Sequence, residues 1–221
     1  WLVSVENSDA AARQFGRTAL EPDELASEVI DVVAAVRRLW DTWEDDAVIR
    51  DFATGRYIDR DLLHYAEFSG RSFSITGPAI TPRPPQGQLP VLVPLAHASG
   101  VDADAVLVDA GPGFTDDVAS ARALQGSPLV IADLEVALDS RGERFGGSAE
   151  ELIERVNAVT EHVDGVRLIP LDLERDLDEL QRVVLPTLIE TGVFAPPSRT
   201  HARSTFGLSH APNVFAASRS H

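Results

Sequence analysis

The chain has 221 residues, a formal charge of −16 and a sequence pI near 4.6. A chain this acidic shows no basic stripe that would neutralise a row of phosphates, so we expect no nucleic acid as a partner. Its composition, 44% apolar and 24% charged, is that of a globular protein that buries a core without a disulfide or metal staple.

Cysteine and methionine are absent, and every basic residue is arginine. Without cysteine there are no thiol nucleophiles, zinc–thiolate sites or disulfides, and without lysine there is no P-loop or Schiff-base lysine. No stretch reaches the roughly 18 apolar residues of a membrane span, and Glu6 and Asp9 interrupt the apolar opening where a signal peptide would lie. We therefore expect no membrane partner, a cytoplasmic location and, since methionine is absent, further residues ahead of Trp1.

The first part of the chain predicts helices followed by a long insertion. The apolar run 1–5 favours a strand, and the cap-forming residues after it favour a short helix over 10–15. Pro22 suits a first helical position, and apolar residues at three- and four-residue steps predict a long core-facing helix from there. Residues 44–88 lose this periodicity and are broken by glycine and proline, which indicates an insertion with a hairpin near 66–76.

The second part alternates strands and helices. Apolar runs rich in Val, Ile and Leu predict buried strands, and capping residues predict helices between them. This alternation is typical of a parallel sheet or barrel with helices outside. The strands are expected over 90–95, 105–108, 129–138 and 165–169, and the helices over 115–124, 148–159 and 176–190, the last broken at Pro186.

Two domain-level expectations follow. Residues 1–194 are predicted to form one barrel-like α/β domain that carries the insertion at about 44–88. Residues 195–221, rich in Pro, Ser and Arg, are predicted to form a C-terminal tail that wraps the surface.

Linked motifs between residues 39 and 88 resemble a known family. They are Leu-Trp-Asp-Thr-Trp-Glu-Asp-Asp (39–46), Asp-Phe-Ala-Thr-Gly-Arg-Tyr-Ile-Asp (51–59), Gly-Arg-Ser-Phe-Ser-Ile-Thr-Gly-Pro (70–78) and Pro-Arg-Pro-Pro-Gln-Gly-Gln (82–88). In this order they resemble the bacterial-luciferase-like flavin-dependent monooxygenases, in the branch of the nitrilotriacetate and dibenzothiophene-sulfone monooxygenases. The similarity thins outward but covers most of the chain, which corresponds to the latter part of a typical family member.

The resemblance implies a TIM-barrel fold of the luciferase-like type, incomplete or truncated in this chain because the family's first three strands have no counterpart. It implies a two-component monooxygenase, in which a separate flavin reductase supplies reduced FMN and the enzyme uses it with O₂ on a small organic substrate. The branch uses FMN, although the deazaflavin F420 serves elsewhere in the superfamily, and the residues do not separate the two.

The candidate cofactor site follows the strand at 90–95, because barrel chemistry sits at the carboxyl ends of strands. In the family a helix opening there helps to hold the flavin phosphate, whereas here the next strand begins almost at once and the helix is expected to be cut to a turn. A plain connecting loop is the alternative. The expected cofactor-binding residues are His97, Ala98, Ser99 and Gly100.

Other candidate sites carry weaker signals. Arg83, in a stiff proline-rich segment, is the candidate for binding a substrate carboxylate or phosphate, with pairing to an acid as the alternative. Gly111-Pro112-Gly113 offers amides to an anion, with a simple turn as the alternative. Glu44, Asp45 and Asp46 point in different directions, and the histidines lack metal-ligand spacing, so we predict no metal; the catalytic residues stay unassigned.

A second reading assigns the chain to another class. It is a shortened, non-catalytic relative that acts as a partner or structural subunit and binds flavin weakly or not at all. A third reading is that residues outside this sequence complete an ordinary enzyme. Because an incomplete barrel exposes sheet edges that must be paired or covered, a homodimer or other oligomer is expected in each case.

Overall fold

The computed structural model describes residues 1–138, 146–196 and 201–217. Contacts divide this chain into two compact units. The helical unit contains residues 1–91, 99–102 and 201–217, and the sheet unit contains residues 92–98, 103–138 and 146–196. One domain over 1–194 with a separate tail stays a prediction.

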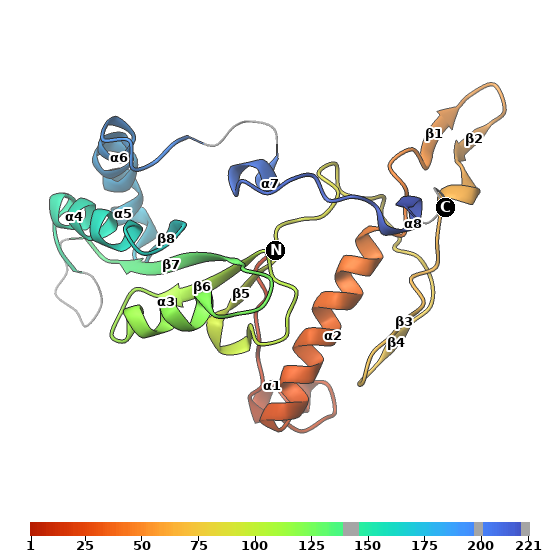
Figure 1. Ribbon diagram of the computed structural model, residues 1–221, viewed down its shortest axis with the longest axis horizontal. Coiled ribbons are helices and arrows are strands. Elements are labelled where there is room, and N and C mark those ends of the chain that lie inside the picture. Colours follow the sequence, from red (N-terminus) through yellow and green to blue (C-terminus); the bar gives the residue numbers. More distant parts are fainter. Residues whose placement is uncertain (139–145, 197–200, 218–221) are drawn as a thin grey trace. The chain divides into compact units, whose positions relative to one another are not determined.

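The sheet unit contains parallel strands in sequential order, β5-β6-β7-β8 (Figure 1). Sequential parallel strands joined by right-handed crossovers place their connecting helices on one face of the sheet. The strands are β5 Leu92–Pro94, β6 Ala105–Asp109, β7 Leu129–Val136 and β8 Gly165–Pro170, and the helices are α3 Phe114–Arg122, α4 Ala149–Thr160, α5 Leu173–Glu179 and α6 Leu185–Glu190. The predicted alternation of strands and helices is confirmed, and the described strands form an open sheet, not a closed barrel.

Burial along β7 shows which face carries the core. Val130, Ala132, Leu134 and Val136 are buried, because the strand period of two puts them on the face where α3 contacts β6 and β7 and α4 contacts β8. From the helix side, Leu152, Val156 and Val159 of α4 are buried as well. The next residues along the strand, including Asp133 and Glu135, point to the opposite face.

Local signals set the helix boundaries. Ser148 caps α4, its hydroxyl accepting from the Glu151 amide at 3.3 Å while the Glu151 carboxylate accepts from the Ser148 amide at 2.9 Å. At the other end of the unit a π-helical turn, Leu180–Val184, ends and α6 begins with Pro186 in its first turn, so the predicted change of helix at Pro186 is confirmed, although the backbone stays helical across it. Pro186 has no amide to donate, and the wider turn before it accommodates that missing bond.

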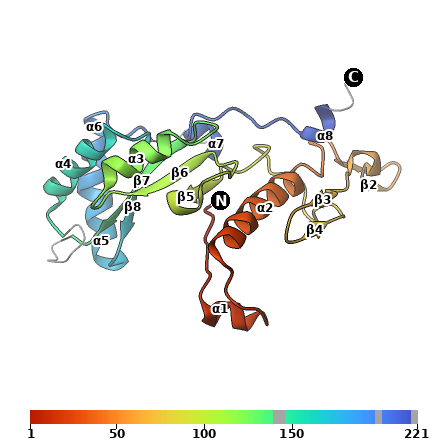
Figure 2. The same cartoon turned by 60° about the horizontal axis from the view of Figure 1, so that its bottom comes forward.

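The helical unit is built on one long helix (Figure 2). Ser8 caps the short first helix by accepting from the Ala11 amide at 3.2 Å. The predicted strand over 1–5 is wrong, since only Leu2 has a bridge, whereas the predicted hairpin near 66–76 is confirmed. The elements are α1 Asp9–Gln14, α2 Pro22–Trp40, the antiparallel pairs β1 Val48–Asp51 with β2 Arg56–Ile58 and β3 Phe68–Ser69 with β4 Ser74–Ile75, and the short helices α7 Ala202–Thr205 and α8 Val214–Ala217.

Among the described helices, none combines the length and the apolar character that crossing a membrane requires.

Asp164 ties the start of β8 to β7. Its carboxylate accepts from the Val130 amide and from Arg122, each at 2.7 Å. Burial by itself raises the pKa of Asp164, but the hydrogen bonds from Arg122 and Val130 outweigh it and hold the pKa below its ordinary value of 3.8. The carboxylate therefore stabilises the fold above about pH 5, and this contribution is lost as the pH falls through the folded-state pKa.

Asp164→Asn is expected to lower the stability of the sheet unit by about 1 kcal/mol at pH 7, a modest figure because the ion pair is partly exposed. The deficit should shrink below pH 3.8. Hydrogen exchange of the β7 amides measures it, with Glu154→Gln on the exposed side of α4 as the control. An equal loss of protection in both variants, or a loss that does not depend on pH, would contradict the assignment.

Candidate functional site

The carboxyl edge of β5 leads into a single 3₁₀ turn, Leu95–His97, in which the Ala98 amide donates to the Leu95 carbonyl at 3.1 Å. Because β6 begins at Ala105, the expectation that the helix after this strand is cut to a turn is confirmed. Of the predicted cofactor-binding residues, His97 and Ala98 belong to the sheet unit and Ser99 and Gly100 to the helical unit. Their role in binding a cofactor stays a prediction.

The turn after β6 is closed on itself. The Phe114 amide donates to the Gly111 carbonyl at 3.2 Å, and the Asp116 and Asp117 amides both donate to the Gly113 carbonyl at 3.0 Å. Asp116 and Asp117 lie in the first turn of α3, and their negative charges disfavour the binding of an anion there. These contacts match the simple turn that the sequence left as the alternative to anion binding.

A flavin phosphate needs unpaired amides in a neutral or positive setting. After β5 the described residues offer one short turn whose last amide is used, and after β6 they offer a turn flanked by Asp109, Asp116 and Asp117. These two segments therefore do not fit the phosphate of a flavin.

The face of the sheet opposite the helices is polar near its carboxyl edge. Asp109 of β6, Asp133 of β7 and Arg167 of β8 lie side by side in register. Arg167 holds Asp133 in a two-pronged ion pair, with Nε donating at 2.8 Å and Nη2 at 2.5 Å. In (β/α) barrels this face is the interior and its carboxyl end carries the active site, so these side chains are candidates for contacting a substrate.

Sequence reasoning missed this polar face, although a signal was present. Asp133 and Glu135 are two residues apart within an otherwise apolar strand, and the strand period places them on the same face. Charged residues two apart in a predicted buried strand indicate that one of its faces is not buried under helices.

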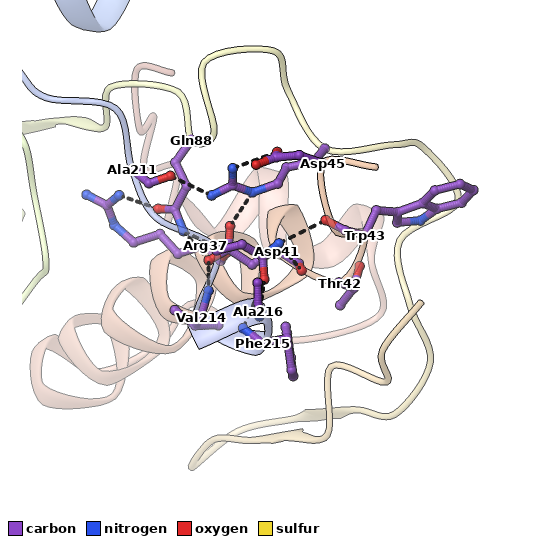
Figure 3. Close-up of polar contacts among 12 residues, drawn as sticks. Arg37, Asp41, Thr42, Trp43, Asp45, Gln88, Ala211, Val214, Phe215 and Ala216 are labelled. Carbon is purple, nitrogen blue, oxygen red and sulfur yellow. Dashed lines mark hydrogen bonds and ion pairs between the residues drawn. The ribbon is translucent and has the colours of Figure 1, made fainter. Parts of the chain in front are cut away.

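The helical unit holds a buried ion pair between Arg83 and Asp41 (Figure 3), whose side chains are 2% and 0% exposed. The Arg83 Nε donates to Asp41 at 2.9 Å, Nη1 to Asp45 at 3.0 Å and Nη2 to the Ala211 carbonyl at 2.8 Å. Each nitrogen of the guanidinium thus has a partner within the protein. This matches the alternative to substrate binding that the sequence left open, in which Arg83 pairs with an acid. Substrate binding by Arg83 stays a prediction.

The remaining donors around Asp41 come from distant parts of the chain (Figure 3). The Gln88 side-chain amide donates to the second carboxylate oxygen at 3.0 Å, and the Val214 amide donates to it at 3.3 Å. The Asn213 side chain donates to the carbonyls of Asp41 and Trp43 at 2.9 Å each. A buried carboxylate with this many donors fixes α2, the loop near residue 88 and the C-terminal segment together.

His64 has a packing role. Its ring stacks on Phe215 with centroids 4.7 Å apart, and its Nε2 lies 2.7 Å from Glu44. The Arg38 guanidinium lies over the Phe215 ring, 5.1 Å from its centroid. Within residues 1–138, 146–196 and 201–217, no group of His, Asp and Glu side chains forms a metal site.

Part of the chain is similar in sequence to known monooxygenases. A dibenzothiophene-sulfone monooxygenase of Rhodococcus erythropolis is 36% identical over 94 residues, which are 42% of this chain and 20% of that protein. The chain is related to the luciferase-like monooxygenases. The match spans about a fifth of this relative's length, and no family model matches the chain.

Two solved structures show the luciferase-like fold. A long-chain alkane monooxygenase superposes with a TM-score of 0.75 and 18% identity over 100% of this chain and 70% of that one. A riboflavin lyase, solved with a modified FMN and riboflavin, superposes with a TM-score of 0.74 and 18% identity over 92% of this chain and 66% of that one. The chain thus has the predicted fold class, α/β of the TIM-barrel type and incomplete here.

Asp41→Asn is expected to destabilise the helical unit by about 3 kcal/mol, because it leaves the Arg83 charge buried without its main partner. Urea unfolding followed by tryptophan fluorescence measures the loss in this unit, since all 3 tryptophans lie in it.

The matched control is Asp45→Asn. Asp45 is the second carboxylate partner of Arg83, and its side chain is 59% exposed. This variant should cost less than about 1 kcal/mol. Equal costs for the two variants would show that the buried pair does not hold the unit together.

Proposed function

We propose that the chain is a flavin-dependent monooxygenase of the two-component kind, which takes reduced FMN from a separate flavin reductase and uses O₂ to oxygenate a small organic substrate. The observation that carries the proposal is the 36% identity over 94 residues to a dibenzothiophene-sulfone monooxygenase. The fold shared with a riboflavin lyase solved with a modified FMN supports flavin as the cofactor. A cytoplasmic location is part of the same proposal.

Under this proposal the flavin, away from its phosphate, contacts His97, Ala98, Ser99 and Gly100. Arg83 contacts the substrate or holds in place the segment that does. His97 has a half-buried side chain at the carboxyl edge of β5, the end of the sheet where barrel enzymes hold their cofactors. The reduced cofactor supplies the electrons for oxygen chemistry, and the protein supplies binding, orientation and exclusion of water.

The carboxyl edge of the parallel sheet favours a second candidate function, that of a non-catalytic subunit. The single turn after β5 and the acids after β6 do not fit a phosphate, which is what a non-catalytic subunit that binds flavin weakly or not at all would show. The described sheet pairs no strand beyond β5 or β8, and edges of this kind are covered by another segment or another chain. This supports a homodimer or other oligomer under both candidates.

Titration of the purified protein with oxidised FMN, and anaerobically with reduced FMN, separates the two candidates. Micromolar binding that prefers reduced FMN, worth about 8 kcal/mol, is expected for the monooxygenase. His97→Ala should weaken that binding by about tenfold, the loss of one good hydrogen bond, while His210→Ala in the C-terminal segment should leave it unchanged.

The same FMN titration can also contradict the monooxygenase proposal. Absence of binding up to about 1 mM FMN, where affinity is worth only ~4 kcal/mol, would assign the chain to the partner-subunit class. Binding that is intact in both histidine variants would support flavin use but remove residues 97–100 as the site.

A further inference from the structure

A groove of about 410 Å³ lies in the helical unit, where the start of α2 meets the β3–β4 hairpin. It shares no residue with the predicted flavin and substrate sites and lies in a different unit from the parallel sheet. The volume is in the range of about 300 to 1,000 Å³ that small-molecule sites occupy. Its lining residues are Arg17, Leu20, Glu24, Ser27, Glu28, Arg71, Ser72 and Phe73.

The hairpin wall of the groove is held rigidly against α2. The Asp31 carboxylate accepts from the backbone amides of Arg71 at 2.6 Å and Ser72 at 3.3 Å. The approach is so close that a Cβ on Gly70 would lie 2.4 Å from an Asp31 oxygen, so a larger residue there would displace the Asp31 carboxylate. Since these bonds go to the backbone, the position of Arg71 is set without using its side chain.

The charged residues of the groove are two arginines and two glutamates, Arg17, Arg71, Glu24 and Glu28. Arg17 pairs with Glu28 at 2.9 Å, and the Glu24 carboxylate accepts from the Glu21 amide in the capping box of α2. The Arg71 guanidinium donates to the Ser27 hydroxyl at 3.0 Å and, within the described chain, has no carboxylate at ion-pair distance. The Arg71 side chain is exposed, so its remaining donors are accessible to a ligand.

Apolar surface completes the groove. Leu20 and Phe73 are the large apolar side chains among its lining residues, and Phe73 packs beside Phe68 with ring centroids 5.6 Å apart. A planar guanidinium binds a carboxylate through two parallel hydrogen bonds, and leucine and phenylalanine side chains bind an apolar group next to it.

We propose that this groove binds a small organic carboxylate, with the carboxylate on Arg71 and the apolar body between Leu20 and Phe73. The proposal does not rest on the monooxygenase function, because flavin and O₂ have no part in it.

The test is an NMR titration of the full ¹⁵N-labelled chain with phenylacetate, following the Arg71 side-chain Nε–H and the Ser72 amide. Saturable shifts at millimolar phenylacetate are expected at these two signals. Phenylacetamide, which has the same shape without the charge, should bind about tenfold more weakly, because the charge-assisted hydrogen bonds are lost.

Arg71→Gln is expected to weaken phenylacetate binding by about tenfold or more. Its folding is checked by the Ser72 amide, whose bond to Asp31 does not involve the changed side chain. Arg60→Gln, an exposed arginine of the same unit outside the groove, is the matched control and should bind like the parent.

Three results would overturn the proposal. They are no saturable shift up to about 20 mM phenylacetate, a limit near 2 kcal/mol of affinity, equal binding of phenylacetate and phenylacetamide, or equal binding by the Arg71→Gln and Arg60→Gln variants. Inorganic phosphate is the last probe, since phosphate that binds as tightly as phenylacetate would contradict the role of Leu20 and Phe73.

Discussion

The helical unit depends on the Arg83–Asp41 ion pair. A fully buried carboxylate is strongly unfavourable unless its partners replace the water it loses, and here they come from residues 83, 88 and 214. Segments far apart in the sequence must therefore come together for the charge to be tolerated. The pair stabilises little by itself but specifies which segments meet.

The sheet unit follows a different rule, in which the face under the helices is apolar throughout and the opposite face becomes polar near its carboxyl edge. Burial under α3 and α4 accounts for the alternate Val, Ala and Leu residues of β7. The ion pair of Asp133 with Arg167 and the neighbouring Asp109 lie on the face that fold relatives use as a barrel interior. The family relation and the polar face thus point to the same end of the sheet, while the short turn after β5 removes one part of the family's cofactor site.

Elements with a local cause were predictable from the sequence. The strands of the sheet unit follow from apolar runs, and α4 follows from the Ser148 capping box, because both signals lie within the element itself. Pro186 opens α6 as predicted, whereas the π-helical turn before it has no sequence signature and was not predictable. The partners of Arg83 and the docking of Arg71 beside Ser27 were not predictable, since they join residues 38 to 128 positions apart.

The segment around Asn213 is recognised in the way a peptide ligand is. The Asn213 side chain donates to two carbonyls, and the Val214 amide donates to the Asp41 carboxylate. The Phe215 ring stacks on His64. Because ligand and slot belong to one chain, the segment is present at an effective concentration of the order of millimolar. Contacts too weak to hold a free peptide are therefore sufficient to keep it bound, and a second chain offering the same residues would compete for the slot only at comparable concentration.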